Sequence, residues 1–269
     1  MNTHASWRID RDAYDQLLTL PYSGWCWEYK RRDGALKSAA RRLSARRPTI
    51  LRRPDGSTVY RLRTRQPQAE KFGLYYLPDP SLNAFQTTPF WLPESMSTHL
   101  NASSETNDQK RVIEPPLRWD EIPGEKHFLI SPGRRPKIII EAPGYAAQLA
   151  IEEHALPVPH AVYLSLRLGA GLLQGRNLSS VEEFARHCLG RDVTCKTLRG
   201  YSPETLRNTI IALDGHLAGV TQRQIAEVIF GVDAVSRDWN SGVKSYKSRT
   251  RRLIKKGVEL MKFGNKYLL

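Results

Sequence analysis

The sequence has few of the residues that mark disulfide-stabilised or membrane proteins. It holds three cysteines among 269 residues, Cys26, Cys188 and Cys195. An odd, scattered set of this size argues against a disulfide framework and favours a reducing compartment. No run approaches the roughly twenty apolar residues that cross a bilayer, and the first residues lack the basic-then-apolar order of a secretory signal. We therefore expect a cytoplasmic protein without a membrane association.

Catalytic and cofactor motifs are also missing. The sequence has no Walker-type glycine loop, no Gly-x-Ser-x-Gly, and no histidine followed three residues later by arginine, which a tyrosine recombinase would require. Asp79, Asp108 and Lys110 loosely match a nuclease pattern, but Asp108 lies in a polar stretch rather than a core strand. His187, Cys188 and Cys195 match no usual zinc-ligand spacing and lack a fourth partner. We expect no enzymatic activity, no cofactor and no metal.

Acidic residues are scarce relative to basic ones. The chain carries 41 Lys and Arg against 27 Asp and Glu, a formal net charge of +14. Between Lys30 and Arg65 the imbalance is 13 basic residues against two acids, Asp33 and Asp55. Such a run lines either phosphates or an acidic protein, because the arginine fork pairs with both phosphate and carboxylate groups. The sequence does not distinguish these two partners.

The first part of the chain favours helices. A short helix is expected after Asp10 or Asp12, and a second one from about Ser23 places several aromatic residues close together. For these aromatics we favour a small helical core over a platform on which bases stack. The run Phe72–Leu77 has the composition of a strand.

The middle of the chain alternates breakers and β-branched runs. The polar stretch Ser95–Gln109 predicts a flexible linker. The two β-branched runs at 127–130 and 137–140 predict a hairpin, followed by a strand at 146–151 and a helix at 161–173. The expected fold class is α+β. The predicted division is a helical basic domain at 1–75, a Pro-rich and polar linker at 76–110, a β meander plus helix at 111–175, and a helix-turn-helix-like DNA-binding domain at 176–269.

The strongest pattern lies in the last seventy residues. Ser202 followed by Pro203 starts a helix expected over 203–217, and Thr221 with Gln224 forms a capping box before a helix over 222–230. Ala226 stands where a helix-turn-helix needs a small residue. The connection 232–242 is longer than the three or four residues of the simplest such motifs, which indicates a variant.

A third helix, from about Val243 to Phe263, is strongly basic, with Glu259 as its only acid. Its polar face fits a major groove, in which Arg and Lys reach guanine edges and flanking phosphates. The candidate DNA-binding residues are Arg223, Lys244, Ser245, Lys247, Ser248, Arg249, Arg251, Arg252, Lys255 and Lys256. The start of the helix is expected to approach bases, and Arg223, Lys255 and Lys256 to approach phosphates. The alternative for this segment is a helical bundle with a solvated basic face.

Two blocks of sequence resemble a known family. The blocks are Gly24-Trp25-Cys26-Trp27-Glu28-Tyr29 with its neighbours from Trp7 to Arg32, and a C-terminal set including Leu213–Gly219, Gln224-Ile225-Ala226, Asp238-Trp239 and Arg249–Ile254. They resemble the N- and C-terminal domains of FseA-type transcriptional activators of bacterial integrative and conjugative elements. The resemblance implies a regulator that activates genes for element excision or transfer and that a small antiactivator can bind.

The sequence thus predicts a transcriptional regulator that binds double-stranded DNA, with a homodimer as a further expectation because the sites of such proteins are often palindromic. The competing hypothesis is a protein-interaction module, antiactivator-like or polymerase-binding, with little direct DNA contact. DNA binding that weakens as the salt concentration rises would favour the DNA-binding regulator over the protein-interaction module.

Overall fold

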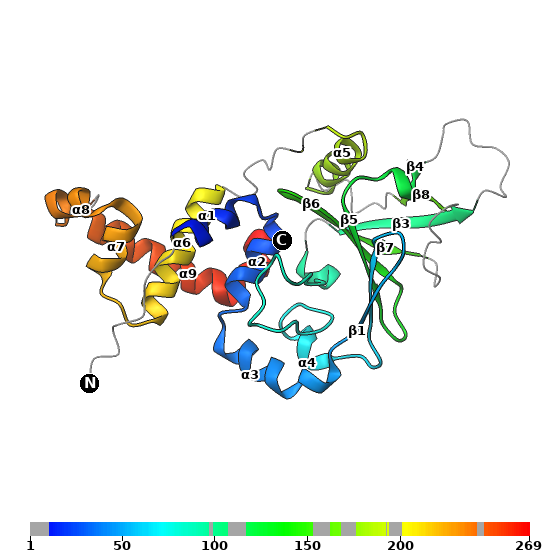
Figure 1. Cartoon of the computed structure of the whole chain (residues 1–269), viewed down its shortest axis with the longest axis horizontal. Helices are drawn as coiled ribbons and strands as arrows, with labels where there is room; N and C mark the ends of the chain where they lie inside the picture. The colour runs from blue at the N-terminus through cyan, green and yellow to red at the C-terminus, as the bar shows by residue number, and fades with distance from the viewer. Residues whose placement is uncertain are drawn as a thin grey trace.

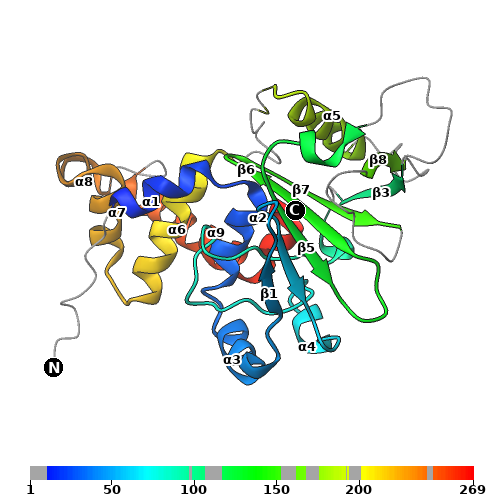
Figure 2. The same cartoon turned by 45° about the vertical axis from the view of Figure 1, so that its right-hand side comes forward.

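The computed structural model describes residues 11–96, 99–106, 117–152, 162–167, 176–191, 193, 201–240 and 245–269. A mixed β-sheet occupies one end of the molecule and a group of helices the other (Figure 1). The predicted α+β class is confirmed. The helices of the bundle come from both ends of the chain, so the N-terminal α1 and α2 lie beside α6 and α9 (Figures 1 and 2).

The described strands form one eight-stranded sheet in the order β1-β2-β5-β6-β7-β3-β8-β4. The β2–β5 and β3–β7 pairs are parallel and the other pairs are antiparallel. The strands are β1 Thr49–Arg52, β2 Thr58–Arg61, β3 His99–Thr106, β4 Leu117–Arg118, β5 Glu125–Ile130, β6 Lys137–Ala142, β7 Tyr145–Ile151 and β8 Val162–Arg167.

The predicted hairpin and the strand after it are confirmed as β5, β6 and β7. Both faces of this part of the sheet are covered, which explains why the run Ile138–Ile140 is continuously apolar rather than alternating. Ile138 and Phe128 share one core with Phe184 of helix α5 (Arg176–Cys188). Ile139 packs on the opposite face with Tyr76 and other residues of the segment 74–92.

Three predictions for the middle of the chain are wrong. Val162–Arg167 is a strand, β8, rather than part of a helix over 161–173, and residues 168–173 lie outside the described residues. His99–Thr106 is strand β3, between β7 and β8, rather than part of a flexible linker. Phe72–Leu77 forms no strand and only an isolated bridge joins Leu74 to Trp91, because this segment covers the sheet instead of extending it.

The helices are short in the first third of the chain and longer at its end. The α-helices are α1 Arg11–Asp15, α2 Tyr22–Lys30, α3 Gly34–Arg42, α4 Pro67–Glu70, α5, α6 Pro203–Leu217, α7 Gln222–Phe230, α8 Val232–Asp238 and α9 Tyr246–Leu268. The 3-10 turns are η2 Gln16–Thr19, η3 Ser44–Arg46, η4 Pro93–Ser95 and η5 Trp119–Glu121.

The N-terminal aromatics are core residues, as predicted. Trp25, Trp27 and Tyr29 are each at most 1% exposed, so they offer no surface on which bases could stack. Their core also contains Leu213 of α6 and Leu260 of α9. One hydrophobic core therefore joins the first and last parts of the chain.

The packing crosses the predicted domain boundaries. Segments 1–75 and 176–269 share the helical core, and β2 of the first segment pairs with β5 of the third. The first segment is also not purely helical, since it contains β1 and β2. Whether any of the four segments folds alone stays a prediction.

Candidate nucleic-acid interface

Helices α6 and α7 begin and end where the sequence predicts. The Ser202 side chain accepts a hydrogen bond from the Thr205 N–H at the start of α6, and Pro203 occupies its first turn. The Thr221 hydroxyl accepts a bond from the Gln224 N–H, while the Gln224 side chain accepts one from the Thr221 N–H, which completes the capping box of α7. Gly231 ends α7 with φ 92°.

The small residue at position 226 lies where two helices meet. Ile225, Ala226 and Ile229 turn inward from α7 and form a core with Ile211 and Ala212 of α6. Ala226 is fully buried. Because these side chains hold α7 against α6, and α7 also contacts α9, the three helices form a fixed unit.

The connection between α7 and α9 is not a plain loop. Residues 232–238 form helix α8, whose Val235 is buried, and residues 241–244 lie outside the described residues. The sequence carried no separate start signal for α8 because Gly231 serves both as the C-cap of α7 and as the N-cap of α8. The segment between α7 and α9 thus contains a short helix that the sequence did not predict.

Helix α9 presents a buried stripe and a basic face. Thr250, Gly257 and Leu260 are buried, as the predicted inward stripe requires. Because an α-helix has about 3.6 residues per turn, Lys247, Arg251 and Lys255 form one row on the outside. The exposed basic residues of α9 are Lys247, Arg249, Arg251, Arg252, Lys255, Lys262 and Lys266. This face is available to a polyanion.

Arg249 is held by two aromatic rings. Its guanidinium carbon lies 4.4 Å from the ring centre of Phe230 at the end of α7 and 5.2 Å from that of Tyr246. Its side chain stays exposed. Stacking restricts the rotamers of the guanidinium while leaving the donors at its edge free for a second partner.

Two candidate residues have partners within the protein. Ser245 is buried and its hydroxyl caps α9 by accepting a bond from the Ser248 N–H, so we no longer assign it to base contact. The ammonium of Lys256 lies 3.2 Å from the Glu259 carboxylate and 4.5 Å from the Tyr267 ring centre. These contacts hold Lys256 against α9 and its surroundings, and its expected phosphate contact stays a prediction.

The remaining candidates are placed as follows. Arg223 is exposed on α7 and forms an ion pair with Glu227 one turn further on, at 3.2 Å. Ser248 is half-buried in the first turn of α9. Lys244 lies outside the described residues. The structure therefore brings Lys247, Arg251, Arg252 and Lys255 together on one face of α9. Arg249 lies at the flank of α9 that faces Phe230 of α7, and Arg223 lies on α7 itself.

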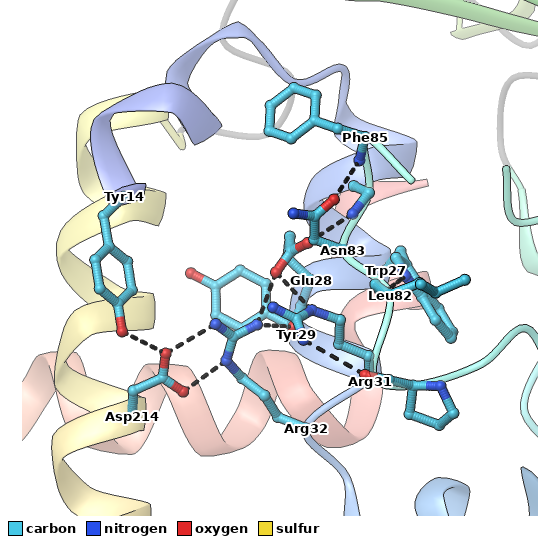
Figure 3. A network of polar contacts seen from close by, with 12 residues as sticks. Tyr14, Trp27, Glu28, Tyr29, Arg31, Arg32, Leu82, Asn83, Phe85 and Asp214 are labelled. Carbon is cyan, nitrogen blue, oxygen red and sulfur yellow. Dashed lines mark hydrogen bonds and ion pairs between the residues drawn. The ribbon is translucent and has the colours of Figure 1, made fainter. Parts of the chain in front are cut away.

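A polar network that joins α1, α2 and α6 was not among the sequence predictions. Arg32, just after α2, donates from Nε and Nη2 to both carboxylate oxygens of Asp214 in α6, at 2.6 and 2.8 Å (Figure 3). The Tyr14 hydroxyl donates to the same carboxylate at 2.7 Å, and Arg32 also contacts Glu28 at 2.9 Å. Burial alone would lower the pKa of Arg32, but the hydrogen bonds and charge of Asp214 raise it above its usual value.

A second link joins α2 directly to α9. The Lys30 ammonium, on a buried residue, donates to the backbone carbonyl of Lys262 at 2.7 Å, and burial lowers the pKa of this lysine. The Tyr29 hydroxyl donates to the Leu206 carbonyl at 2.7 Å. No local pattern could reveal these links, because their partners are more than 170 positions apart.

The described residues of the metal and nuclease hypotheses contact other parts of the protein. Nε2 of His187 lies 2.8 Å from the Pro123 carbonyl oxygen and its ring stacks on Tyr145, while Cys195 lies outside the described residues. Asp79 pairs with Arg47 at 2.9 Å, and Asp108 and Lys110 are not described. In the described part of the chain no group of three or more metal-ligating side chains is placed to hold an ion. Nor do the described helices include one that is long and apolar enough to span a membrane.

Comparison with known proteins agrees with the position of this face. Residues 169–269 match the RovC_DNA-bd family model, described as the DNA-binding domain of a T6SS transcription factor. No curated protein matches the chain. The matched segment contains α5 to α9, including the entire basic face of α9. The chain is therefore a DNA-binding regulator of the transcription-factor type, and its DNA-binding domain is its C-terminal part.

Proposed function

We propose that the protein recognises a specific DNA sequence by placing the first half of α9 in the major groove. The observation that carries this proposal is the exposed row of Lys247, Arg251 and Lys255 on a helix whose opposite stripe is buried. The match to a transcription-factor DNA-binding domain over the same residues supports it. An α-helix fits the width of the major groove, and its first turns approach the bases in helix-turn-helix proteins.

The proposed contacts divide into two kinds. Arg249 and Arg251 lie in the first turns, where their forks can donate two parallel bonds to a guanine edge. Lys255 and Arg223, further along the face and on α7, contact phosphates, which fix the register without carrying sequence information. Phe230 and Tyr246 hold the Arg249 guanidinium in place before DNA arrives.

For the regulated genes we propose activation of functions for mobile-element excision or conjugative transfer. The resemblance of both ends of the sequence to FseA-type activators supports this assignment. A second candidate is a set of type VI secretion genes, which the description of the matched family favours. In either case we propose that the protein acts in the cytoplasm, without enzymatic activity or cofactor. It binds a palindromic site as a homodimer. Its protein partner is RNA polymerase or a small antiactivator.

The test uses the full chain and DNA from upstream of its own gene and neighbouring genes. Arg249→Ala is expected to lower affinity for the protected site by about 1–3 kcal/mol with little change on random DNA. Arg249→Lys should give much of the same loss, because lysine keeps the charge but not the fork. Lys255→Ala should weaken all sequences alike and reduce the salt slope by about 1.

Arg135→Ala is the matched control, since Arg135 is exposed on the β5–β6 connection, outside the matched segment 169–269. It should leave affinity and specificity unchanged. Similar losses on specific and random DNA for Arg249→Ala and Lys255→Ala would reject the proposed division of contacts. Absence of DNA binding at low salt would favour the protein-interaction module.

A further inference from the structure

A second cationic surface lies outside the matched DNA-binding domain. Helix α3 and the turn η3 carry four exposed basic residues within ten positions, which we call the α3 basic surface. It consists of Lys37, Arg41, Arg42 and Arg46. Helix α3 and η3 contain no acidic residue. Because no acid of α3 or η3 offsets these positive charges, the surface has a positive potential that attracts polyanions.

Four other arginines of the same region differ from these cations, because they have acidic partners. Arg31 and Arg32 pair with Glu28, Arg47 with Asp79 and Arg65 with Glu70, at 2.7 to 2.9 Å. Among the described residues, no acid lies within ion-pair distance of the α3 basic surface. These four side chains are therefore available to an anionic partner outside the chain.

The α3 basic surface is fixed relative to α9. Asp33 caps α3 by accepting a bond from the Ala35 N–H at 2.8 Å, immediately after α2. On its inner side α3 buries Leu36, Ala39 and Ala40 in the core that also contains Leu260 of α9. Since α2 is bound to α6 by the network of Figure 3 and to α9 by the bond from Lys30 to the Lys262 carbonyl, α3 cannot turn independently of the DNA-binding domain.

The surface lies at the C-terminal end of α9, away from the proposed base contacts. Lys30, four residues before α3, is bonded to the Lys262 carbonyl, which is fifteen residues after Lys247. At about 1.5 Å per residue this corresponds to roughly 22 Å along the helix. The major groove is only about 12 Å wide. Contacts from α3 therefore fall outside the base pairs that the start of α9 reaches.

We propose that the α3 basic surface is a second DNA-contact site, which grips the phosphate backbone beside the segment that α9 reads. The inference rests on the proposed function and extends it to the N-terminal part of the chain. Phosphates fit better than an acidic protein, because the cores of protein interfaces are apolar and α3 exposes no large hydrophobic side chain. Along the sequence, the next exposed large hydrophobic side chains are those of Ile50 and Leu51 on β1.

The test compares two triple variants of the full chain with equal change in charge. Arg41→Ala, Arg42→Ala and Arg46→Ala together remove most of the α3 basic surface, and alanine preserves the helix. The control variant carries Arg61→Ala, Lys71→Ala and Arg135→Ala, exposed positions on β2, just after α4 and on the β5–β6 connection, outside the matched segment 169–269. The probes are the footprinted duplex and a random duplex of equal length, titrated at several salt concentrations.

The α3 variant should lose the same factor of affinity on both duplexes, and its salt slope should fall by about 2–3, close to 0.9 per lost phosphate contact. Its hydroxyl-radical footprint should lose protected positions at the same end of each half-site of the palindrome. Loss no larger than that of the control would overturn the inference, and so would intact DNA binding with lost activation, which would indicate an acidic protein partner. Lys255→Ala separates the two proposals, since its failure to weaken binding would count against the role of α9 itself.

Discussion

Glu141 is a half-buried carboxyl with an unusual titration. It lies in β6 with 29% of its side chain exposed, and its Oε2 is 3.9 Å from Nε2 of His127. Burial, followed by the nearby charge of Glu125, raises its pKa to about 7. In the unfolded chain the same carboxyl ionises near its usual value of about 4.3. Its folded form therefore retains a proton that the unfolded form releases, and stability falls as the pH rises from about 4.5 to 7.

Glu141→Gln is expected to remove this pH dependence. The amide stays neutral, so the variant should gain roughly 2–3 kcal/mol relative to the unmodified protein between pH 5 and pH 8. His127 acts in the opposite sense, because burial lowers its pKa and stability then rises with pH up to about 6.5. The difference between the two proteins cancels this contribution. Urea unfolding at pH 5 and pH 8 measures the free energy of unfolding of both proteins. A difference between the proteins that is the same at the two pH values would contradict the expectation.

Single residues of the candidate site show what spacing can and cannot tell. The basic face of α9 follows from helical periodicity, since the inward stripe was evident as Thr250, Gly257 and Leu260. The roles of Ser245 and Lys256 did not follow, because a serine before a helix and a lysine on a basic helix suit caps, ion pairs and DNA contacts equally well. Their partners within the protein are evident only from the structure.

At the scale of the element, α6 and α9 approach closely because α9 has a glycine at the crossing. A Cβ added to Gly257 would lie 2.9 Å from the Leu213 Cβ and 3.0 Å from the Thr209 carbonyl oxygen. Gly257→Ala should therefore push the helices apart and destabilise the protein by about 1–3 kcal/mol, despite the better helix propensity of alanine. Thermal or denaturant unfolding measures the loss.

Gly264 of the same helix is the matched control. An added Cβ there would meet the Cys26 Sγ at 3.6 Å, an ordinary contact. Gly264→Ala should be neutral or stabilising by up to about 1 kcal/mol. If both substitutions had the same effect, helix propensity rather than the α6–α9 approach would govern these positions.

Elements were predictable where local signals agreed. Helix α7 was placed to the residue, because a capping box marks its start and Gly231 its end. Strand β8 was mistaken for a helix, since Val162 and Leu166 are consistent with both helical and strand periods in so short a run. Strand β3 has a polar sequence that favours a linker, and its place in the sheet comes from pairing with the distant β7 and β8. Such non-local pairing leaves no trace in a single sequence.

At the scale of the whole molecule, the DNA-binding domain is completed by the N-terminal helices. The core around Trp25 and Trp27 extends into the matched segment, where it contains Leu206, Ile210 and Leu213 of α6 and Leu260 of α9. Each of these four is fully buried. The predicted boundary near residue 176 followed the change in sequence pattern, whereas the core follows contacts between residues nearly 200 positions apart.

An isolated fragment of residues 169–269 should therefore fail to fold stably. Removing residues 1–168 would expose those four side chains, each worth about 1.5–3 kcal/mol when buried, or roughly 6–12 kcal/mol in total. That is comparable to the entire stability of a typical domain, about 5–15 kcal/mol. The fragment would also lose the Arg32 partner of Asp214.

We expect the full chain to unfold cooperatively on heating, and the fragment to bind a hydrophobic dye without a sharp transition. Adding residues 11–96 in trans should recover part of the transition, because that piece carries α2 and α3. A fragment that melts cooperatively within a few degrees of the full chain would show instead that α5 to α9 form a self-sufficient domain, and that the shared core only docks the two ends of the chain.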